Sequence, residues 1–425
     1  MTELVLGLDQ GTSSTRCLAL DRDLVVRGSG VVAVGASFPA AGLVEQDPAE
    51  LAASASAAID HALRAAGGRR DDAVAVGIAN QTETFLICER ASGRPIHPAI
   101  VWQDRRTADV CEALTAAGHA QAVRSRTGLE LDATFPATKI AWVLDRVPGA
   151  RAAAASGALM YCDVGAWLVR HLTSLEACDV GNAGRTLLCG LGAGDWDDEL
   201  LELFGVPRVL MAPIVDSDWY AGAASGRAQP ATAMPVSVVL GDQQASLLGL
   251  GCRAPGMAKV TLGTGAFVLA QAGPDAPAAP DGVLGSCAWR LGGEAAFALE
   301  GFVPAAGAAL DWLVDLGLLP PAAELDALLS HAGPEDGTVA CVPALQGLGT
   351  PGWNASVRGA LLGLSRATTR AQLARAAIDG IVHQVADALD AIRASMGVET
   401  VLLDGGMSRS DWIAQRLADL AAVQV

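Results

Sequence analysis

The chain has 425 residues, of which 51% are hydrophobic and only 4% are aromatic. So much hydrophobic material excludes a globally disordered chain, and the length indicates two or more domains. The 46 acidic residues outnumber the 29 basic ones, so the net charge is −17. A chain this acidic lacks the basic surface of a nucleic-acid-binding protein, although a nucleotide can still bind through backbone N–H groups, a metal ion and local arginines.

The nine cysteines are scattered and form no CxxC pair. This pattern favours isolated core residues in a reducing compartment over metal–thiolate sites. No stretch approaches the roughly 18 uncharged apolar residues of a membrane span, and the first residues form a strand-like run without a basic segment and cleavage site. We therefore expect a cytoplasmic protein that has neither a membrane partner nor a nucleic-acid partner.

The first hundred residues alternate between strand and helix signals. Residues 48–66 form an Ala-rich segment that Asp47 is placed to cap, with Pro48 at the first helical position, which predicts a helix. The opening hairpins make the expected α/β sheet mixed rather than purely parallel. The expected strands are 4–9, 15–21, 24–34 and 73–78, the last ending in the polar cluster 80–84.

The remaining elements repeat part of this pattern. Residues 107–196 are expected to be mainly helical, and the strands 236–240, 258–262, 267–271 and 401–404 follow, with helices after residue 241 and over 411–422. Two strand–turn–strand units, one near the start of each half, indicate an internal duplication. We expect domains at 1–250 and 251–425. Residues 423–425 read as the beginning of another strand, so the second domain is expected to be incomplete.

A polar turn follows the first strand of each half. Asp9 ends the first strand and is followed by residues 11–14 (GTSS), while residues 263–265 (GTG) follow the corresponding strand later. Glycine lets a phosphate approach the backbone, and N–H groups and hydroxyls donate to its oxygens. The chain has no GxxxxGKS motif, and its one GxGxxG, at 347–352, contains a proline and opens no helix, so P-loop and Rossmann sites are excluded.

Asp242 follows a buried strand and precedes two glutamines. An Asp in this place is either an N-cap or a general base, with Gln243 orienting a hydroxyl. The six histidines show no ligand spacing. Residues 102–106 (WQDRR) place two arginines beside a carboxylate, and spacing alone favours a solvated helix start with internal ion pairs.

Taken in order, these segments resemble the FGGY family of carbohydrate kinases, and most closely its glycerol kinases. Each motif is weak alone, but the ordered set covers nearly the whole chain. The resemblance implies two actin-like, ribonuclease-H-like domains with mixed sheets and with ATP and Mg²⁺ in the cleft between them. The motifs are Gly7–Thr12 (GLDQGT), Trp102–Arg106, Asn182–Thr186 (NAGRT), Asp195–Asp198 (DWDD), Gly241–Ala245 (GDQQA), Gly263–Gly265, Pro343–Gly349 (PALQGLG), Arg358–Leu364 (RGALLGL) and Asp404–Gly406 (DGG).

The resemblance also implies a set of site residues. We expect Asp242 to be the catalytic base, and we expect Asp9, a carboxylate at a strand end, to hold Mg²⁺ through water. The substrate positions are Thr82, Glu83, Thr134, Asp242, Gln243 and Phe267. The nucleotide positions are Thr12, Ser13, Ser14, Arg16, Thr264, Gly307, Asp311, Gly406 and Ser410. Glycerol kinases carry Arg at position 82 and Tyr at position 134, and often Gln at 311 and Asn at 410, so the substrate pocket is expected to be wider and differently polar.

We therefore expect ATP-dependent phosphorylation of a hydroxyl of a small polyol or sugar by a homo-oligomer, a dimer or a tetramer. One alternative is a kinase for xylulose or for another ketose or sugar alcohol. Another is a catalytically impaired, actin-like nucleotide-binding paralogue. Asp242 and Gln243 favour an enzyme, whereas an incomplete second domain favours the impaired paralogue.

Overall fold

The computed structural model describes residues 3–220, 233–320, 324–329, 339–354 and 356–425. The chain forms two compact units. Unit 1 contains Met1–Ala245 together with Ser286–Ala296, and unit 2 contains Ser246–Gly285 together with Phe297–Val425. The chain therefore passes from one unit to the other three times.

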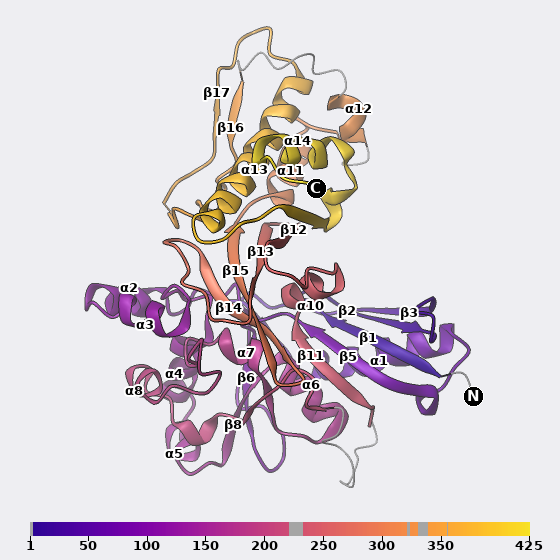
Figure 1. Ribbon diagram of the computed structural model, residues 1–425. Coiled ribbons are helices and arrows are strands. Elements are labelled where there is room, and N and C mark those ends of the chain that lie inside the picture. The colour runs from indigo at the N-terminus through magenta and orange to yellow at the C-terminus, as the bar shows by residue number, and fades with distance from the viewer. Residues whose placement is uncertain (1–2, 221–232, 321–323, 330–338, 355) are drawn as a thin grey trace. The chain divides into compact units, whose positions relative to one another are not determined.

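Unit 1 is built on a five-stranded mixed sheet with the strand order β11-β5-β1-β2-β3 (Figure 1). Strand β1 runs parallel to β5, and β5 runs parallel to β11, whereas β2 and β3 are antiparallel to their neighbours. The predicted hairpins and the mixed character of the sheet are confirmed. The strands are β1 (Leu4–Gln10), β2 (Ser14–Leu20), β3 (Val26–Ala33), β5 (Ala73–Asn80) and β11 (Val236–Gly241).

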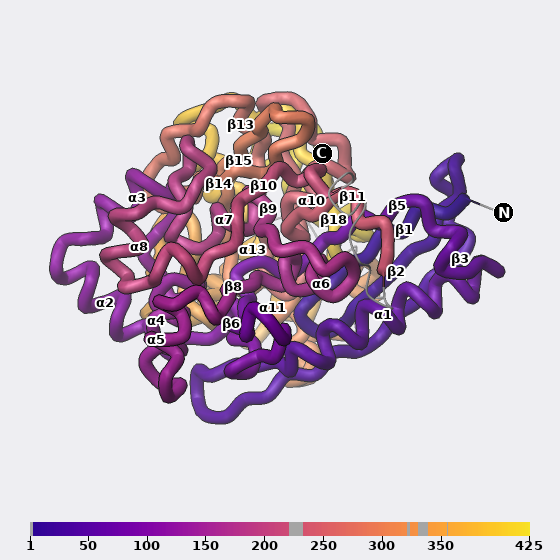
Figure 2. The backbone as a smooth tube through the Cα atoms, turned by 90° about the horizontal axis from the view of Figure 1, so that it is seen from below, coloured from indigo at the N-terminus to yellow at the C-terminus, as the bar shows by residue number. Residues whose placement is uncertain are grey.

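Helix α1 (Pro48–Ala65) packs against β2 and β3 and runs along them (Figure 2). The Asp47 side chain accepts a hydrogen bond from the Ala49 N–H, and Pro48 occupies the first turn, as the sequence predicts. The close approach requires glycine in β3. A Cβ at Gly28 or at Gly30 would lie 2.3 Å from a carbonyl oxygen of α1.

The middle of unit 1 is less helical than expected. Strand β8 (Leu159–Asp163) interrupts the predicted helical region and joins a second sheet with the order β4-β7-β6-β8. All five residues of β8 are buried, so its sequence lacks the alternation that identifies a half-buried strand. The other strands are β4 (Glu45–Gln46), β6 (Phe85–Glu89), β7 (Ala99–Ile100), β9 (Cys178–Asp179) and β10 (Ile214–Val215). The helices are α2 (Ala108–Ala116), α3 (Ala120–Thr127), α4 (Pro136–Arg146), α5 (Ala150–Ala155), α6 (Val164–Thr173), α7 (Val180–Gly184) and α8 (Asp198–Phe204), with short 3₁₀ turns at Arg70–Asp72 and Arg208–Leu210.

Unit 2 repeats the sheet pattern of unit 1, in the order β14-β15-β13-β12-β18. Strand β12 pairs in parallel with β18 and antiparallel with β13, as β1 does with β5 and β2, which confirms the duplication. Gln424 adds one parallel bridge to Thr400 of β18. These strands are β12 (Met257–Leu262), β13 (Ala266–Gly273), β14 (Leu284–Leu291), β15 (Glu294–Val303) and β18 (Thr400–Asp404).

The core of unit 2 lies between this sheet and helix α13 (Arg370–Arg393), which buries a long apolar stripe and contacts β13. Thr369 and Gln372 form a capping box at the start of α13. The remaining elements are α10 (Asp242–Gly249), α11 (Gly307–Asp315), α12 (Leu325–Leu329), β16 (Ala340–Val342), β17 (Ala360–Leu362), a 3₁₀ turn at Gly406–Arg409 and α14 (Asp411–Ala421).

The hairpin of β14 and β15 is divided between the two units: its residues Ser286–Ala296 belong to unit 1. There the Arg290 carbonyl accepts the Ser217 N–H at 2.8 Å, the Arg290 guanidinium pairs with Asp216, and Gly292 N–H donates to Asp218. This part of the hairpin is thus fixed by the segment 216–218.

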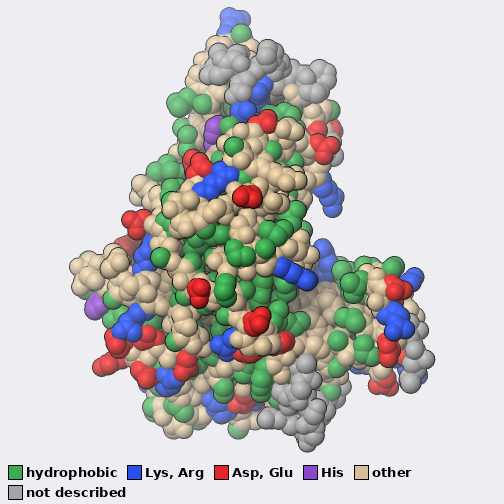
Figure 3. Space-filling view, in the orientation of Figure 1, with side chains coloured by type: hydrophobic (Ala, Val, Ile, Leu, Met, Phe, Trp, Pro, Cys, Tyr) green, Lys and Arg blue, Asp and Glu red, His purple; other side chains and the backbone are tan. Residues whose placement is uncertain are grey.

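The surface carries acidic and basic side chains that are interspersed on the face seen in Figure 3. All nine cysteines are free thiols, and only Cys341 is not fully buried. Within the described ranges, no helix is both long and apolar enough to cross a bilayer.

Candidate functional site

Three parallel strands of unit 1 end side by side. In the strand register Gln10 lies opposite Asn80, and Asn80 lies opposite Gly241. The residues that follow these strand ends are therefore neighbours at one edge of the sheet. Ligands of open α/β sheets bind at the carboxyl ends of the strands, so this edge is the candidate site of unit 1.

The turn at residues 11–14 is held in a fixed shape by its neighbours. Gly11 N–H donates to the Ser14 carbonyl at 3.0 Å, and the Gln46 amide donates to the Thr12 carbonyl at 2.7 Å. The indole N–H of Trp102 donates to Thr12 Oγ1 at 3.1 Å. The Thr12 hydroxyl therefore accepts from Trp102, and its own hydrogen can be donated to a phosphate oxygen. Ser13 is exposed and Ser14 is half-buried beside it.

Asp9 lies opposite Arg16 in the β1–β2 ladder. Desolvation raises the pKa of Asp9, and the positive charge of Arg16 offsets part of the rise. Among the residues that the structure describes, no group of three or more His, Cys, Asp or Glu side chains forms a metal cage. Mg²⁺ is commonly held by one or two carboxylates together with substrate phosphates, and Asp9 beside a hydroxyl-rich turn fits that arrangement.

Asp242 is the first residue of α10 and is half-buried, as is Gln243. Its carboxylate accepts the Gln243 N–H at 2.7 Å. The preceding Gly241 leaves no room for a side chain, because a Cβ there would lie 2.5 Å from Thr82 Cγ2 and 2.4 Å from Gln244 Oε1. Thr82 therefore packs directly against the strand end that presents Asp242.

Thr82 and Glu83 form a buried polar pair beside Arg185. Thr82 Oγ1 donates to Glu83 Oε2 at 2.6 Å, and Arg185 Nε donates to Glu83 Oε1 at 2.6 Å. The guanidinium of Arg185 also lies over the Phe135 ring, 5.4 Å from its centroid. Our sequence prediction of the site missed Arg185. Its one signal was the NAGRT motif, which gives no indication of a contact with Glu83.

Thr134 belongs to a second polar cluster of unit 1. Its N–H and its hydroxyl both donate to Asp132 Oδ1, at 2.8 and 2.7 Å, and Asp132 also pairs with Arg105. The Thr134 carbonyl accepts from Lys139 Nζ at 2.8 Å. Lys139 also contacts the Val101 carbonyl at 3.5 Å, so it connects the two backbone segments that carry Thr134 and Trp102.

The interpretation of residues 102–106 as a solvated helix start is wrong for Asp104 and Arg106, whereas the expected internal ion pair is confirmed. The side chain of Arg106 is 2% exposed and that of Asp104 is 0% exposed, and the two form an ion pair at 2.8 Å. Arg106 pairs with Glu45 as well, and Asp104 accepts the Val44 N–H at 2.7 Å. The charges are buried because β4 and the segment before it cover them, and nothing in the local sequence indicates this long-range packing.

Lys139 should make stability depend on pH at alkaline values. Burial lowers the pKa of Lys139 to about 8, and the charges of Asp104, Glu83 and Asp132 only partly oppose this effect, while Arg105 adds to it. Between pH 8 and 10.5 the unfolded chain therefore binds the proton more strongly than the folded one. The stability of the parent relative to Lys139→Met should rise by about 3 kcal/mol across this window. Urea unfolding of both proteins at several pH values measures this difference, and a difference that stays constant would contradict the assignment.

The second turn, in unit 2, is fixed by the start of α11. Gly307 N–H donates to the Gly263 carbonyl at 2.8 Å, and the N–H groups of Ala306 and Ala308 donate to the Thr264 carbonyl at 2.9 and 3.0 Å. A Cβ at Gly307 would lie 2.6 Å from the Gly263 carbonyl oxygen. Glycine at 307 thus allows the close contact, and the Thr264 side chain remains exposed.

The other nucleotide positions lie on neighbouring elements of unit 2. Asp311 is exposed on α11, one turn after Gly307. Ser410 caps α14 by accepting the Ile413 N–H at 3.3 Å and donates to Asp326 at 2.5 Å. Gly406 is exposed, and a Cβ there would meet no atom within 4 Å. Gly405 next to it has φ +89°, and a Cβ would lie 2.5 Å from the Leu262 carbonyl oxygen.

The predicted site residues thus divide between the two units. Phe267 lies in unit 2 on β13, with its ring centroid 4.9 Å from that of Phe302. At the carboxyl edge of the unit 1 sheet lie Asp9, Thr12, Ser13, Ser14, Arg16, Thr82, Glu83, Asp242 and Gln243, whereas Thr134 is connected to that edge through Lys139. In unit 2 lie Thr264, Phe267, Gly307, Asp311, Gly406 and Ser410.

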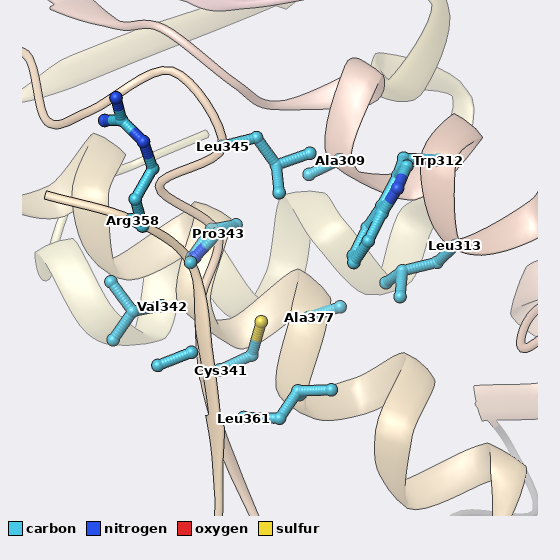
Figure 4. A pocket seen from close by; sticks show the side chains of 12 residues that line it. Ala309, Trp312, Leu313, Cys341, Val342, Pro343, Leu345, Arg358, Leu361 and Ala377 are labelled. Carbon is cyan, nitrogen blue, oxygen red and sulfur yellow. The ribbon is translucent and has the colours of Figure 1, made fainter. Parts of the chain in front are cut away.

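Unit 2 also contains an apolar cavity of about 330 Å³ between α11, α13 and the antiparallel strand pair β16–β17. Figure 4 shows Trp312 and Leu313 of α11 on one side and Cys341 and Pro343 on the other. Of the lining residues, Arg358 is the only charged one. A polyol or a phosphate needs convergent polar groups, so this cavity does not match either.

The chain is similar to known proteins over its whole length. Residues 4–249 match the N-terminal domain of the FGGY family of carbohydrate kinases, and residues 258–425 match its C-terminal domain. A glycerol kinase of Methylobacterium nodulans is 46% identical over 433 aligned residues, which cover 100% of this chain and 86% of that protein. The crystal structure of Plasmodium falciparum glycerol kinase with ADP has a TM-score of 0.91 at 26% identity, covering 99% of this chain and 85% of that one. A xylulose kinase structure from Brucella ovis has a TM-score of 0.86 at 27% identity, with coverages of 99% and 86%.

Proposed function

Because the chain belongs to the FGGY family of carbohydrate kinases, we propose that it transfers the γ-phosphoryl group of ATP to a hydroxyl of a small polyol or sugar. One observation carries the proposal for this chain. Asp242, Thr82 and Glu83 meet at the carboxyl edge of the unit 1 sheet, where Gly241 packs against Thr82. A carboxylate beside hydrogen-bonding groups is what a hydroxyl substrate needs in order to be oriented and deprotonated.

In this proposal Asp242 accepts the proton of the attacking hydroxyl. The hydroxyl oxygen forms the new bond to the γ-phosphorus, the bond to the β,γ-bridging oxygen breaks, and ADP leaves. Gln243 and Glu83 orient the substrate. Phosphoryl transfer needs little covalent help from the protein, so positioning and charge neutralisation supply most of the acceleration.

In this proposal, residues of both polar turns contact ATP. In unit 1 the phosphate contacts are Thr12, Ser13, Ser14 and Arg16, and in unit 2 the nucleotide contacts are Thr264, Gly307, Asp311, Gly406 and Ser410. Mg²⁺, held through water by Asp9, would neutralise phosphate charge during the transfer. Support comes from the fixed backbone of the two turns and from the hydrogen bond of Trp102 to Thr12.

A coupled ADP-release assay over polyols and ketoses with three to six carbons tests the function. At least one substrate should give turnover well above the ATPase background, and turnover should require Mg²⁺. ATP binding without acceptor-dependent ADP release from any of these compounds would support the impaired paralogue instead. The structural similarity to a xylulose kinase is the reason for including five-carbon ketoses.

Substrate length should depend on positions 82 and 134. Threonine at these positions supplies neither a guanidinium nor a phenol ring, so glycerol loses hydrogen-bond partners while a fourth or fifth carbon gains space. Missing hydrogen-bond partners weaken the binding of a substrate strongly, whereas an unfilled volume of one methylene group weakens it by only about 1–3 kcal/mol. We expect a longer polyol or ketose to be preferred over glycerol, which should show a raised KM.

The double variant Thr82→Arg, Thr134→Tyr should shift the kcat/KM ratio toward glycerol by about 10-fold or more, since two hydrogen bonds are each worth about 1 kcal/mol. Measuring kcat/KM for glycerol and for four- and five-carbon polyols on parent and variant decides the question. Glycerol as the best substrate of the unmutated protein would contradict the wider pocket.

A further inference from the structure

Helix α7 and the residue that follows it contact residues 80–83, the segment that carries the substrate positions Thr82 and Glu83, at two points. The side-chain amides of Asn182 and Asn80 exchange two hydrogen bonds, at 3.0 and 3.1 Å. Arg185, which caps the C-terminal end of α7, donates to Glu83 at 2.6 Å. The two partners in each segment are three residues apart, so α7 and its cap hold the segment from Asn80 to Glu83 at both ends.

Both contacts are shielded from water. Asn80 and Asn182 are 0% and 2% exposed, and the side chains of Glu83 and Arg185 are 7% and 11% exposed. A charge-assisted bond in such a place is stronger than one at the surface. Glu83 also has φ +60°, a left-handed conformation that persists only when the surroundings fix it.

Helix α7 is itself anchored by contacts with residues outside this segment. Asp179 caps its N-terminal end by accepting the Asn182 N–H at 2.9 Å, and Asp179 accepts the Ser217 hydroxyl at 2.6 Å. At the other end the Arg185 guanidinium lies over Phe135. A helix fixed at both ends can impose one position on the carboxylate that it contacts.

We propose that Arg185 is a positioning residue that sets affinity and selectivity for the acceptor substrate by fixing the Glu83 carboxylate. This inference rests on the proposed function. Each carboxylate oxygen has about two acceptor sites, and Arg185 and Thr82 use one on each oxygen. Glu83 thus keeps acceptor sites for a hydrogen bond from a substrate hydroxyl. Because the carboxylate is already held in one orientation, it loses little conformational entropy when the substrate binds.

The kinetic test compares Arg185→Gln and Arg185→Lys with the parent. Arg185→Gln should raise KM for the acceptor by about 10-fold to 100-fold, while kcat and the KM for ATP change by less than about 3-fold. Arg185→Lys keeps the positive charge but lacks the forked guanidinium donors, so its acceptor KM should lie between those of the parent and Arg185→Gln. The matched control is Arg90→Gln, which breaks the Arg90–Glu176 pair near the far end of β6 and should leave both KM values unchanged.

A second measurement does not depend on turnover. Hydrogen exchange of the amides of residues 81–84 should become at least about 10-fold faster in Arg185→Gln and remain unchanged in Arg90→Gln. If Arg185→Gln does not fold because Glu83 is left as an unpaired buried charge, Arg185→Lys, which keeps a positive charge beside Glu83, is measured instead for acceptor KM and for exchange of residues 81–84.

The outcomes separate the two proposals. No turnover in the parent would refute the proposed function and with it the role of Arg185 in acceptor affinity; faster exchange in Arg185→Gln would then show only that Arg185 fixes residues 81–84. Turnover with an unchanged acceptor KM in Arg185→Gln, or equal losses for acceptor and ATP, would refute the role of Arg185. A loss confined to kcat would refute it too, because Arg185 would then act on the chemical step.

Discussion

The variant Asp242→Asn should lose a factor of about 10² to 10⁴ in kcat, the usual contribution of a positioned general base. Asn has nearly the same shape as Asp, and its oxygen can still accept the Gln243 N–H that Asp242 accepts at 2.7 Å. The start of α10 should therefore keep its geometry, and KM for ATP should change little. Steady-state ADP release with the best acceptor from the screen gives the loss directly.

The control for this variant is Asp145→Asn, which removes a carboxylate exposed on the same unit and paired with Arg151. A surface pair of this kind contributes little to stability, so the control should have the kcat of the parent. Turnover of Asp242→Asn within a few-fold of the parent would show that Asp242 is not the base. Unfolding of both variants in urea separates a catalytic loss from a loss of structure.

The variant Gly405→Ala should destabilise unit 2 by about 2–4 kcal/mol. Gly405 has φ +89°, and an added Cβ would lie 2.5 to 2.9 Å from three backbone atoms of Leu262. Neither the backbone conformation nor the contact can be relieved by rotating a side chain, so β12 or the turn after β18 has to move. Thermal unfolding and urea unfolding both report the loss.

Gly406→Ala is a closely matched control, because the added methyl group would meet no atom within 4 Å and its backbone is not left-handed. Its stability should equal that of the parent within about 0.5 kcal/mol. If Gly406 contacts the nucleotide, the same variant should weaken ATP binding without unfolding the protein. Equal stability losses at the two glycines would contradict the geometry of this turn.

The strands that flank the polar turns were predictable because each is a short apolar run that a glycine-containing turn interrupts. These runs place β1, β2, β12 and β13 within one or two residues of their observed limits. The Asp47 cap and Pro48 likewise identify the start of α1 from local chemistry alone. Strand β8 was missed because a fully buried strand has no alternation, and a short apolar run is compatible with a helix as well.

The site was less predictable than the fold, since its contacts join residues that are far apart in the chain. Glu83 and Arg185 are 102 residues apart, and no local pattern connects them. The burial of Arg106 and Asp104 depends similarly on β4 and on Glu45. Short motifs indicate which residue types are available for chemistry, but the tertiary fold decides which of them meet.

The passage of the hairpin Ser286–Ala296 into unit 1 has a consequence for biosynthesis. A ribosome that has released residues up to Ala245 has not yet made the hairpin whose Arg290 and Gly292 bind the segment 216–218. Domains generally fold as units during synthesis, beginning with the N-terminal one, but here that order cannot be completed. The contacts of Asp216 and Asp218 with the hairpin cannot form until Ala296 has emerged. By then the first two strands of the unit 2 sheet are already outside the ribosome. Nascent chains stalled before and after Ala296 has emerged from the ribosome should therefore differ in the protease resistance of their first 245 residues.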